Sequence, residues 1–298
     1  AKVYYDTEAR GKDVSAYAHQ LAATKTNDHL GLKTHFAKLE GLEADKQYYF
    51  IIADKDSVSR AYYFKTASKK ADDFSFIAGG DTKSKSVGKK KKSKKSKKSQ
   101  PASQAKQLSS YDKGRLSNRM VAKLRPLFVL FVGDFTSNSD VAERWVDWFN
   151  DWNKDTCSPD GRMYPIIPVH GNHENPNGLT DLQMLFDTPK AVYYTVDFGI
   201  DFFRVFVLNT ELISGQMKSK VSGLEAKWNE QTKWLDETLA KSSHFQYRAA
   251  MYHKPIRPHT KSKKTPEQVY RDWAPLFSKY KMNLSFDGDS HMHKITYP

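Results

Sequence analysis

The residues of this sequence whose types could do chemistry are carboxylates, an amide and imidazoles that recur along the chain. They are Asp81, Asp134, Asn172, His173, His253, His291 and His293. Each is a hard or borderline metal ligand, or a hydrogen-bonding partner for phosphate. A pair of cations held by such ligands can lower the pKa of water and hold the attacking and leaving oxygens of phosphoryl transfer. The set fits a site of that kind.

These residues follow short apolar segments that have the character of strands. The strands are predicted at 74–78, 127–132, 163–169, 202–208, 246–252 and 282–286. Between them, Trp145, Trp148 and Trp152 lie on one face of an amphipathic helix, and further helices are predicted at 224–239 and 266–280. Because open α/β sheets build their sites beyond the carboxyl ends of the strands, we expect one site made from many segments.

Residues 1–70 carry strand signals and no competing helical period. Within them, segment 39–50 resembles the corner of a fibronectin type III domain, where a leucine, a turn and a tyrosine close one end of a β-sandwich. The hydroxyl of Tyr48 would then bond to the backbone; the alternative is that Tyr48 is only a core aromatic on a strand. Such a sandwich has about seven strands and fewer are visible, so we predict a domain at 1–70 that is incomplete at its N-terminus. A larger domain is predicted at 71–298.

Positive charge is concentrated in one segment of the chain. The 298 residues carry a formal net charge of +14, which taken alone indicates nucleic acid or an anionic membrane as a partner. Ten lysines and no acid lie between Lys83 and Lys98, so the rest of the chain carries only +4. Like charges at this density repel one another, and a Lys-rich disordered loop is predicted at 83–100. It is either a solvated surface insertion or a tether for polyanions such as nucleic acid.

Composition excludes several classes of protein. With 39% hydrophobic and 13% aromatic residues, the chain is not globally disordered. The single cysteine, Cys157, excludes an intrachain disulfide and a cysteine-based zinc site. No segment approaches the roughly 18 apolar residues of a membrane span, so no membrane partner is expected.

Five short motifs occur in order along the larger domain. They are Gly80-Asp81, Gly133-Asp134, Gly171-Asn172-His173-Glu174, Met251-Tyr252-His253-Lys254-Pro255 and His291-Met292-His293. A single Gly-Asp pair is weak evidence, but five motifs in order are specific. They resemble the signatures of the calcineurin-like metallophosphoesterases, most closely those of the purple acid phosphatase branch. The resemblance implies an α/β (α+β) fold, a four-layer αββα sandwich preceded here by the small all-β domain.

The resemblance also implies a binuclear metal site. Asp134 would bridge two metal ions, which could be Fe, Zn or Mn. The first metal site would be completed by Asp81 and His293, and the second by Asn172, His253 and His291. The nucleophile would be a hydroxide held by the metals.

Further residues would act on the substrate. His173 would hydrogen-bond the phosphoryl group or protonate the leaving oxygen, and Glu174 would orient it. Lys83 would face the phosphate as a point charge. Arg257 and His259 are candidate phosphate contacts at the mouth of the site.

Three positions depart from the family pattern. Ser137 stands where the purple enzymes have a tyrosine three residues after the bridging aspartate, so this protein is not expected to be purple. Lys83 replaces the histidine of a D-x-H motif, and a protonated lysine cannot ligate a metal. The last motif lacks the usual glycine before His291. An alternative register makes Asp289 and His291 the ligand pair, but His291 and His293 are preferred because histidines are expected at both positions.

The predicted function is the metal-dependent hydrolysis of phosphate esters on small or large molecules, with monoesters ahead of diesters. The alternative is a catalytically weakened phosphoesterase fold that binds nucleic acid or another polyanion through the Lys-rich loop. The chain begins without an initiator Met or a signal peptide, which indicates a processed or trimmed product. The family resemblance favours a secreted or periplasmic location.

Overall fold

The computed structural model describes residues 1–70, 72–82, 110–157, 160–214, 217, 221–259, 265–292 and 295. The loop predicted at 83–100 lies outside the described residues, and so do Lys83 and His293. The roles predicted for that loop and for these two residues therefore stay predictions.

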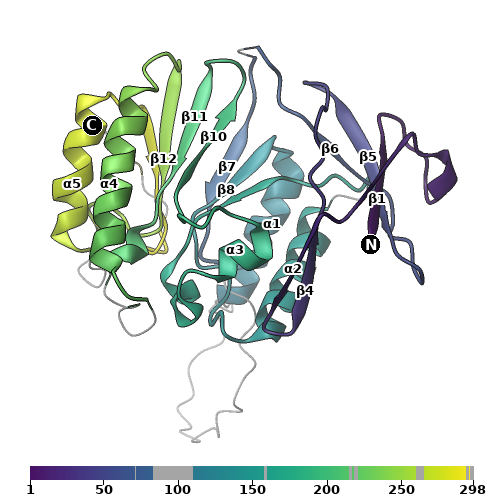
Figure 1. Ribbon diagram of the computed structural model, residues 1–298, viewed down its shortest axis with the longest axis horizontal. Helices are drawn as coiled ribbons and strands as arrows, with labels where there is room; N and C mark the ends of the chain where they lie inside the picture. The colour runs from purple at the N-terminus through teal and green to yellow at the C-terminus, as the bar shows by residue number, and fades with distance from the viewer. Residues whose placement is uncertain are drawn as a thin grey trace, which may run out of the picture.

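Two sheets lie face to face at the centre of the molecule (Figure 1). One is parallel, in the order β7-β8-β9, and the other has the order β10-β11-β12-β13, in which only β10 and β11 are antiparallel. The strands are β7 (Phe76–Gly79), β8 (Phe128–Phe131), β9 (Ile166–Pro168), β10 (Tyr194–Phe198), β11 (Phe203–Val207), β12 (Tyr247–Met251) and β13 (Leu284–Phe286). All six predicted strands are present, and β10 is an edge strand that was not predicted.

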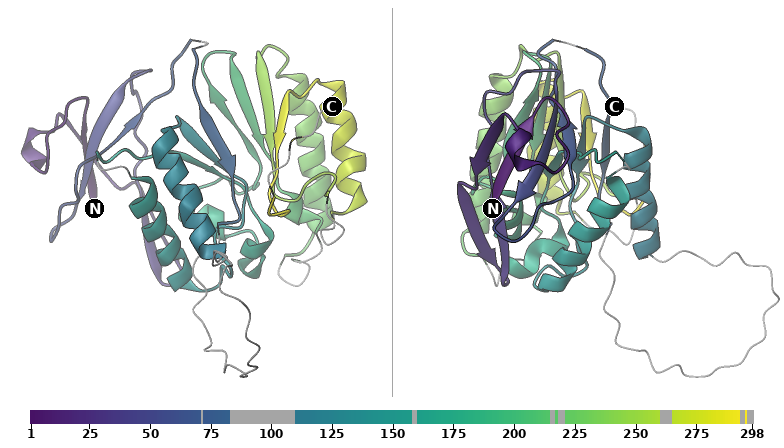
Figure 2. Two further views of the ribbon diagram at one scale, coloured as in Figure 1. Left: turned by 180° about the vertical axis from the view of Figure 1, so that it is seen from behind. Right: turned by 90° about the vertical axis from the view of Figure 1, so that its right-hand side faces the viewer.

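A helical layer covers the outer face of each sheet (Figures 1 and 2). Side chains alternate along a strand, so Leu130 of β8 packs between the sheets while Phe131 packs against the tryptophan face of α2. In the same way Val205 of β11 faces the other sheet and Phe206 faces α4. The helices are α1 (Ser110–Leu124) and α2 (Ala142–Thr156) on one side, and α4 (Leu224–Ala240) and α5 (Glu267–Lys279) on the other. The four-layer αββα sandwich is confirmed.

The N-terminal segment forms small antiparallel sheets beside the sandwich (Figure 2). One sheet has the order β2-β1-β5-β6 and the other is a β3-β4 hairpin. The strands are β1 (Lys2–Asp6), β2 (His19–Ala22), β3 (Lys25–His29), β4 (Leu32–Phe36), β5 (Gln47–Ala53) and β6 (Tyr62–Lys65). Tyr48 is buried on β5, and its hydroxyl accepts a 3.0 Å hydrogen bond from the Glu43 backbone N–H. The predicted link from the hydroxyl to the backbone is thus present.

This all-β segment contacts the sandwich through β6 and through the β3-β4 hairpin. The backbone of Tyr63 in β6 exchanges hydrogen bonds with Gly161 and Met163. In the hairpin, Asn27 donates to the carbonyl of Met184 at the end of α3 (Asp181–Phe186). The second contact ties the hairpin to a helix that follows directly after the third motif.

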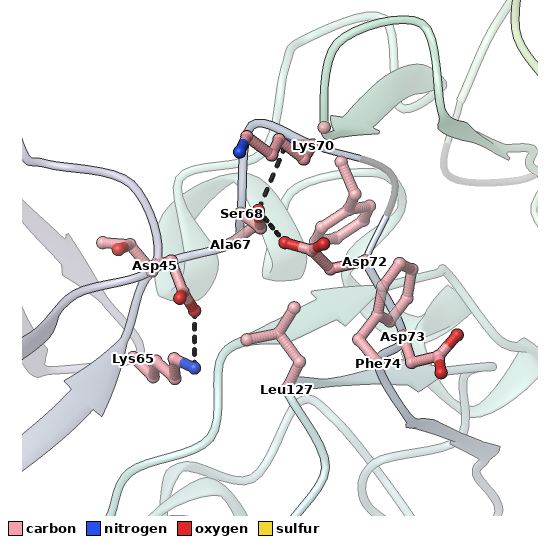
Figure 3. Close-up of a pocket in the computed structure, with 12 residues that line it drawn as sticks. Asp45, Lys65, Ala67, Ser68, Lys70, Asp72, Asp73, Phe74 and Leu127 are labelled. Carbon is pink, nitrogen blue, oxygen red and sulfur yellow. Dashed lines mark hydrogen bonds and ion pairs between the residues drawn. The ribbon is translucent and has the colours of Figure 1, made fainter.

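A shallow pocket of about 70 Å³ lies at the junction of the two parts (Figure 3). Its wall carries ion pairs and hydrogen bonds between side chains, such as Lys65 with Asp45 at 2.5 Å and Ser68 with Asp72 at 2.5 Å. None of the predicted metal ligands lines it. No helix within the described part of the chain is long and apolar enough to cross a bilayer.

Candidate metal centre

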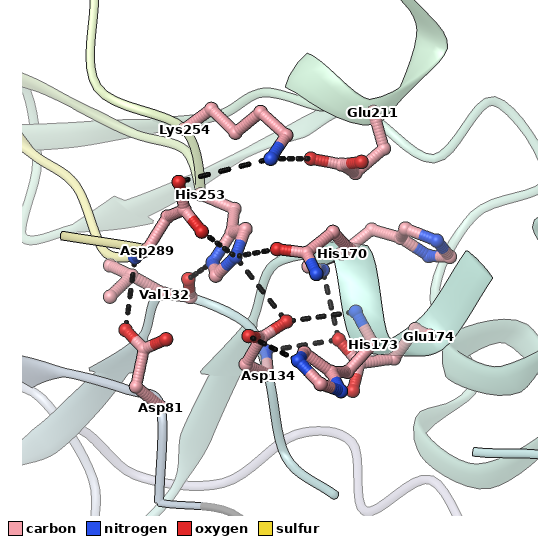
Figure 4. A network of polar contacts seen from close by, with 12 residues as sticks. Asp81, Val132, Asp134, His170, His173, Glu174, Glu211, His253, Lys254 and Asp289 are labelled. Atoms are coloured by element: carbon pink, nitrogen blue, oxygen red, sulfur yellow. Dashed lines mark hydrogen bonds and ion pairs between the residues drawn. The ribbon is translucent and has the colours of Figure 1, made fainter. Parts of the chain in front are cut away.

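Loops after β7, β8, β9, β12 and β13 converge at one edge of the two sheets (Figure 4). At Gly133 and Gly171 the backbone of one loop lies against the residues of its neighbours. A Cβ on Gly133, whose φ is +91°, would lie 2.8 Å from His253 Nδ1, and a Cβ on Gly171 would lie 2.5 Å from Asp134 Oδ1. The two motifs therefore need glycine at these points because the neighbouring backbone and side chains occupy the space.

Asp134 is at the centre of this convergence and is 1% exposed. Its Oδ1 accepts a 2.9 Å hydrogen bond from the backbone N–H of His173 and lies 3.3 Å from Nε2 of His253. Its Oδ2 lies 3.7 Å from Nε2 of His173. Asp134 therefore contacts both His173 and His253, and its bridging role stays a prediction.

His253 is completely buried and has a fixed orientation. Its Nδ1 is 2.7 Å from the carbonyl of Val132, so this nitrogen carries the hydrogen and leaves Nε2 as a potential ligand atom. Around Nε2 lie Oδ1 of Asn172 at 3.1 Å and Oδ1 of Asp289 at 3.9 Å, in addition to Asp134. Oxygens from three loops thus surround one imidazole nitrogen.

The pKa of His253 is set by opposing effects. Burial lowers it, but the carboxylates of Asp134, Asp81 and Glu211 and the hydrogen bond to Val132 together outweigh burial, and the net pKa is raised above its ordinary value. A raised pKa in a buried histidine indicates a strongly negative environment, which is suited to a cation.

Asp81 and His291 form the neighbouring part of the centre. Nε2 of His291 is 3.1 Å from Oδ1 of Asp81, and Asp81, Asp134 and His291 each offer a ligand atom within 4.8 Å of the others. The other oxygen of Asp81 accepts a 3.0 Å hydrogen bond from the backbone N–H of Asp289. Unlike His253, the side chain of His291 is 49% exposed.

Strand register explains why Asp289 and His291 reach the centre. Met251 of β12 pairs with Phe286 of β13, and two residues further on the N–H of Gly288 donates to the carbonyl of His253. Asp289 therefore comes beside His253, and His291 extends to Asp81. Both members of the alternative pair, Asp289 and His291, thus lie at the centre. His293 of the preferred pair is outside the described residues, so the choice between the two registers stays a prediction.

Glu174 is fully buried and organises the loops through the backbone. Its Oε2 accepts hydrogen bonds from the N–H groups of Gly171 (2.9 Å) and Asp134 (3.0 Å), and its Oε1 accepts one from Phe135 (3.0 Å). Burial and the neighbouring Asp134 carboxylate raise the pKa of Glu174 to about 8, whereas the three N–H donors favour the ionised form. Its contacts are with the loops that carry the ligands.

The ring of His173 is oriented by the backbone of Ser137. Its Nδ1 is 2.8 Å from the carbonyl of Ser137, which leaves Nε2 on the side of Asp134. Ser137 therefore orients His173 through its backbone carbonyl, a role that was not predicted for it.

A buried polar network lies behind the centre (Figure 4). The ammonium of Lys254 is 3.8 Å from both Glu211 and Asp289. Glu211 also accepts a 2.9 Å hydrogen bond from Asn175, whose Oδ1 is 3.2 Å from Nε2 of His170. The Lys254 side chain thus compensates two buried carboxylates, one of which lies beside His253. Lys254 belongs to the fourth sequence motif, whereas no local sequence pattern marks Glu211 as a residue of the site.

The two predicted phosphate contacts near α5 lie at the surface. The guanidinium of Arg257 is 3.6 Å from the ring centroid of Tyr270, and His259 is exposed. Neither makes a hydrogen bond or ion pair with the predicted metal ligands that the structure describes. Their contact with substrate remains a prediction.

The calcineurin-like phosphoesterase family model matches residues 109–293, which is more than half of the chain. The chain belongs to the calcineurin-like phosphoesterase family. An uncharacterized protein of Mycobacterium tuberculosis is 26% identical to this phosphoesterase over 200 residues, which are 60% of this chain and 36% of the relative. The chain therefore corresponds to about a third of that relative's length.

Solved structures share the fold of this phosphoesterase. A purple acid phosphatase from yellow lupin (Lupinus luteus) seeds aligns with 97% of this chain and 53% of its own, with a TM-score of 0.66 and 14% identity. A structure of PhoD aligns with 97% of this chain and 64% of its own, with a TM-score of 0.62 and 12% identity. At these identities the likeness concerns the fold.

Proposed function

We propose that this phosphoesterase is a metal-dependent hydrolase of phosphate esters, with monoesters as its first substrate class and diesters as its second. The convergence of oxygens from three loops on Nε2 of His253, beside the Asp81–His291 pair, carries the proposal. Carboxylates, an amide oxygen and imidazoles are the donors that Fe, Zn or Mn ions accept. Fold similarity to a purple acid phosphatase supports the same conclusion.

The residues fit two metal ions. Asp134 would lie between the ions. Asp81 and His291 would hold the first, and Asn172, His253 and Asp289 would hold the second. Bound there, the ions would lower the pKa of a water molecule and neutralise charge on the phosphoryl oxygens.

The chain's own residues position the reactants. The hydrogen bond from Nδ1 of His253 to Val132 keeps Nε2 directed inward. The ring of His173 is held at Nδ1 by Ser137 and is 31% exposed, so its Nε2 can meet substrate. We assign His173 to hold a proton at Nε2 and donate it to a phosphoryl oxygen or to the leaving oxygen.

Metal analysis combined with a hydrolysis assay tests this function. We expect bound metal, and turnover of p-nitrophenyl phosphate exceeding that of its bis-ester, with Zn²⁺, Mn²⁺ or Fe added. Absence of both metal and turnover would overturn the proposal. The alternative, polyanion binding through the Lys-rich segment, would then be tested by deleting residues 89–98 and looking for a salt-sensitive loss of DNA affinity.

Alanine variants of the last motif test the ligand assignment. If Asp289 and His291 are ligands, Asp289→Ala and His291→Ala each lower the metal stoichiometry, whereas His293→Ala leaves it unchanged. The preferred register of the sequence predicts the opposite for Asp289 and His293. Asp289→Asn is the matched variant, because it retains the size of the side chain beside Lys254 while removing its charge.

A further inference from the structure

Arg144 is a partly buried arginine with no carboxylate partner among the described residues. It lies in the first turn of α2, and its Nε is buried without a hydrogen bond. Its one hydrogen bond to a described residue is donated from Nη1 to the hydroxyl of Ser137. By contrast, Arg115 and Arg204 each make two hydrogen bonds to a single aspartate. Because a guanidinium is always charged, a partly desolvated one without a counter-ion is suited to bind an anion.

The hydrogen bond to Ser137 brings that charge to the loop that carries Asp134. Ser137, which receives the hydrogen bond, is three residues after Asp134 in the loop that follows β8. The carbonyl of the same serine holds Nδ1 of His173 at 2.8 Å. One residue therefore contacts both Arg144 and the imidazole assigned to substrate.

We infer that Arg144 binds a phosphoryl oxygen of the substrate and favours phosphomonoesters over phosphodiesters. The inference rests on the proposed function, since it concerns the same site. A guanidinium presents several N–H donors in a plane that matches phosphate oxygens, and Ser137 uses only one of them. A monoester carries one more ionisable oxygen than a diester, so a fixed positive charge beside this loop discriminates in favour of the monoester.

Phosphate affinity distinguishes this role from a structural one. We would measure the affinity of the metal-loaded full chain for inorganic phosphate by calorimetry, in the wild type, in Arg144→Gln and in Lys154→Gln. Lys154→Gln is the matched control, because it removes a positive charge from an exposed position in the last turn of the same helix. We expect Arg144→Gln to weaken phosphate binding by about 10- to 100-fold, and Lys154→Gln to change it by no more than about twofold.

Kinetics with a monoester and a diester test the inferred preference for monoesters. Arg144→Gln should lower kcat/KM for p-nitrophenyl phosphate by a similar factor, and lower it less for the bis-ester, with metal content and melting temperature unchanged. Arg144→Lys, which keeps the charge, should recover part of the loss. Three results would overturn the inference: wild-type phosphate affinity in Arg144→Gln, an equal loss of affinity in Lys154→Gln, or an equal loss of kcat/KM on both esters. If the wild type binds phosphate but hydrolyses neither ester, the proposed function fails, and phosphate binding alone decides the role of Arg144.

Discussion

The two halves of the metal centre differ in how firmly the protein holds them. Around His253, the imidazole, Asp134 and Asp289 are buried, and hydrogen bonds from the backbone or to it fix Asp134 and the imidazole. Around Asp81, the partner His291 is half exposed and belongs to a loop beyond the edge strand β13. Asp134 and His253 follow the central strands β8 and β12, whereas Asp81 and His291 follow the edge strands β7 and β13. We therefore expect the half around His253 to be preorganised and the half around His291 to depend more on bound metal.

Asp134 belongs to both halves, so its replacement should have the largest effect. Asp134→Asn removes the charge but keeps an oxygen that can accept from the His173 N–H. We expect kcat/KM to fall by at least about a hundredfold. Replacing a residue that only hydrogen-bonds to a metal ligand already lowers metal affinity or activity by about 10–100-fold, and Asp134 is itself a candidate ligand. Metal content and hydrolysis of p-nitrophenyl phosphate measure the effect. An unchanged melting temperature of the metal-free protein would show that the fold is intact, and a loss below tenfold would contradict the shared position of Asp134.

Alanine at His253 and at His291 tests the difference between the halves directly. Both variants should lose one metal and most activity. In the metal-free protein, His253→Ala should lower the free energy of unfolding by about 2–3 kcal/mol, because it leaves a buried cavity and a carbonyl without its donor. His291→Ala should change it by less than about 0.5 kcal/mol, as for an exposed side chain. Urea unfolding measures both, and equal losses would show that the halves are equally preorganised.

Glu174 tests whether the backbone hydrogen bonds around His253 produce its rigidity. In Glu174→Gln the amide NH₂ must face at least one of the three backbone N–H groups that the carboxylate accepts from. We expect a loss of about 1–3 kcal/mol in unfolding free energy and about 10–100-fold in activity. Glu143→Gln, at an exposed position in the first turn of α2, is the control and should be neutral. If Glu174→Gln changes neither the free energy of unfolding nor the activity, packing and not these hydrogen bonds produces the rigidity.

A smaller effect is expected in the α1–α2 layer, away from both halves. Asp155 accepts two hydrogen bonds from Arg115, at 2.6 and 2.7 Å. Burial raises the pKa of Asp155, but Arg115 and Arg119 outweigh burial and hold it below its ordinary value of 3.8. The unfolded chain thus binds the proton more tightly, so this stabilisation is complete above about pH 5 and is lost as pH falls through the folded pKa.

Urea unfolding of Asp155→Asn tests that pH dependence. The variant should lose on the order of 2 kcal/mol at pH 7 and less at pH 3. Asp151→Asn is the matched control, because Asp151 lies 3.8 Å from the same arginine. Activity should be unaffected by either change. A loss that is independent of pH would show that the carboxylate charge is not the cause.

Local patterns in the sequence were enough to predict the sandwich and the types of residue at the site. Apolar segments predicted six strands of the sandwich, and the tryptophan stripe predicted α2, because both depend on periodicity along a short segment. The edge strand β10 and helix α1 were not predicted, and neither was the contact of the N-terminal hairpin with α3. The packing of α1 on α2 and the contact of the hairpin with α3 depend on partners that are distant in the sequence, whereas β10 pairs with the next strand, β11.

The sequence by itself determined which ligand types follow which strands, since Gly-Asp and Gly-Asn-His-Glu are local motifs. Only the tertiary structure decided which of them meet. The pairing of Met251 with Phe286 brings Asp289 to His253, and the close approach at Gly133 and Gly171 brings Asp134 to His253. The roles of Glu211 and Arg144 arose in the same way. A site built from five loops is defined by strand register and backbone packing, which no single segment encodes.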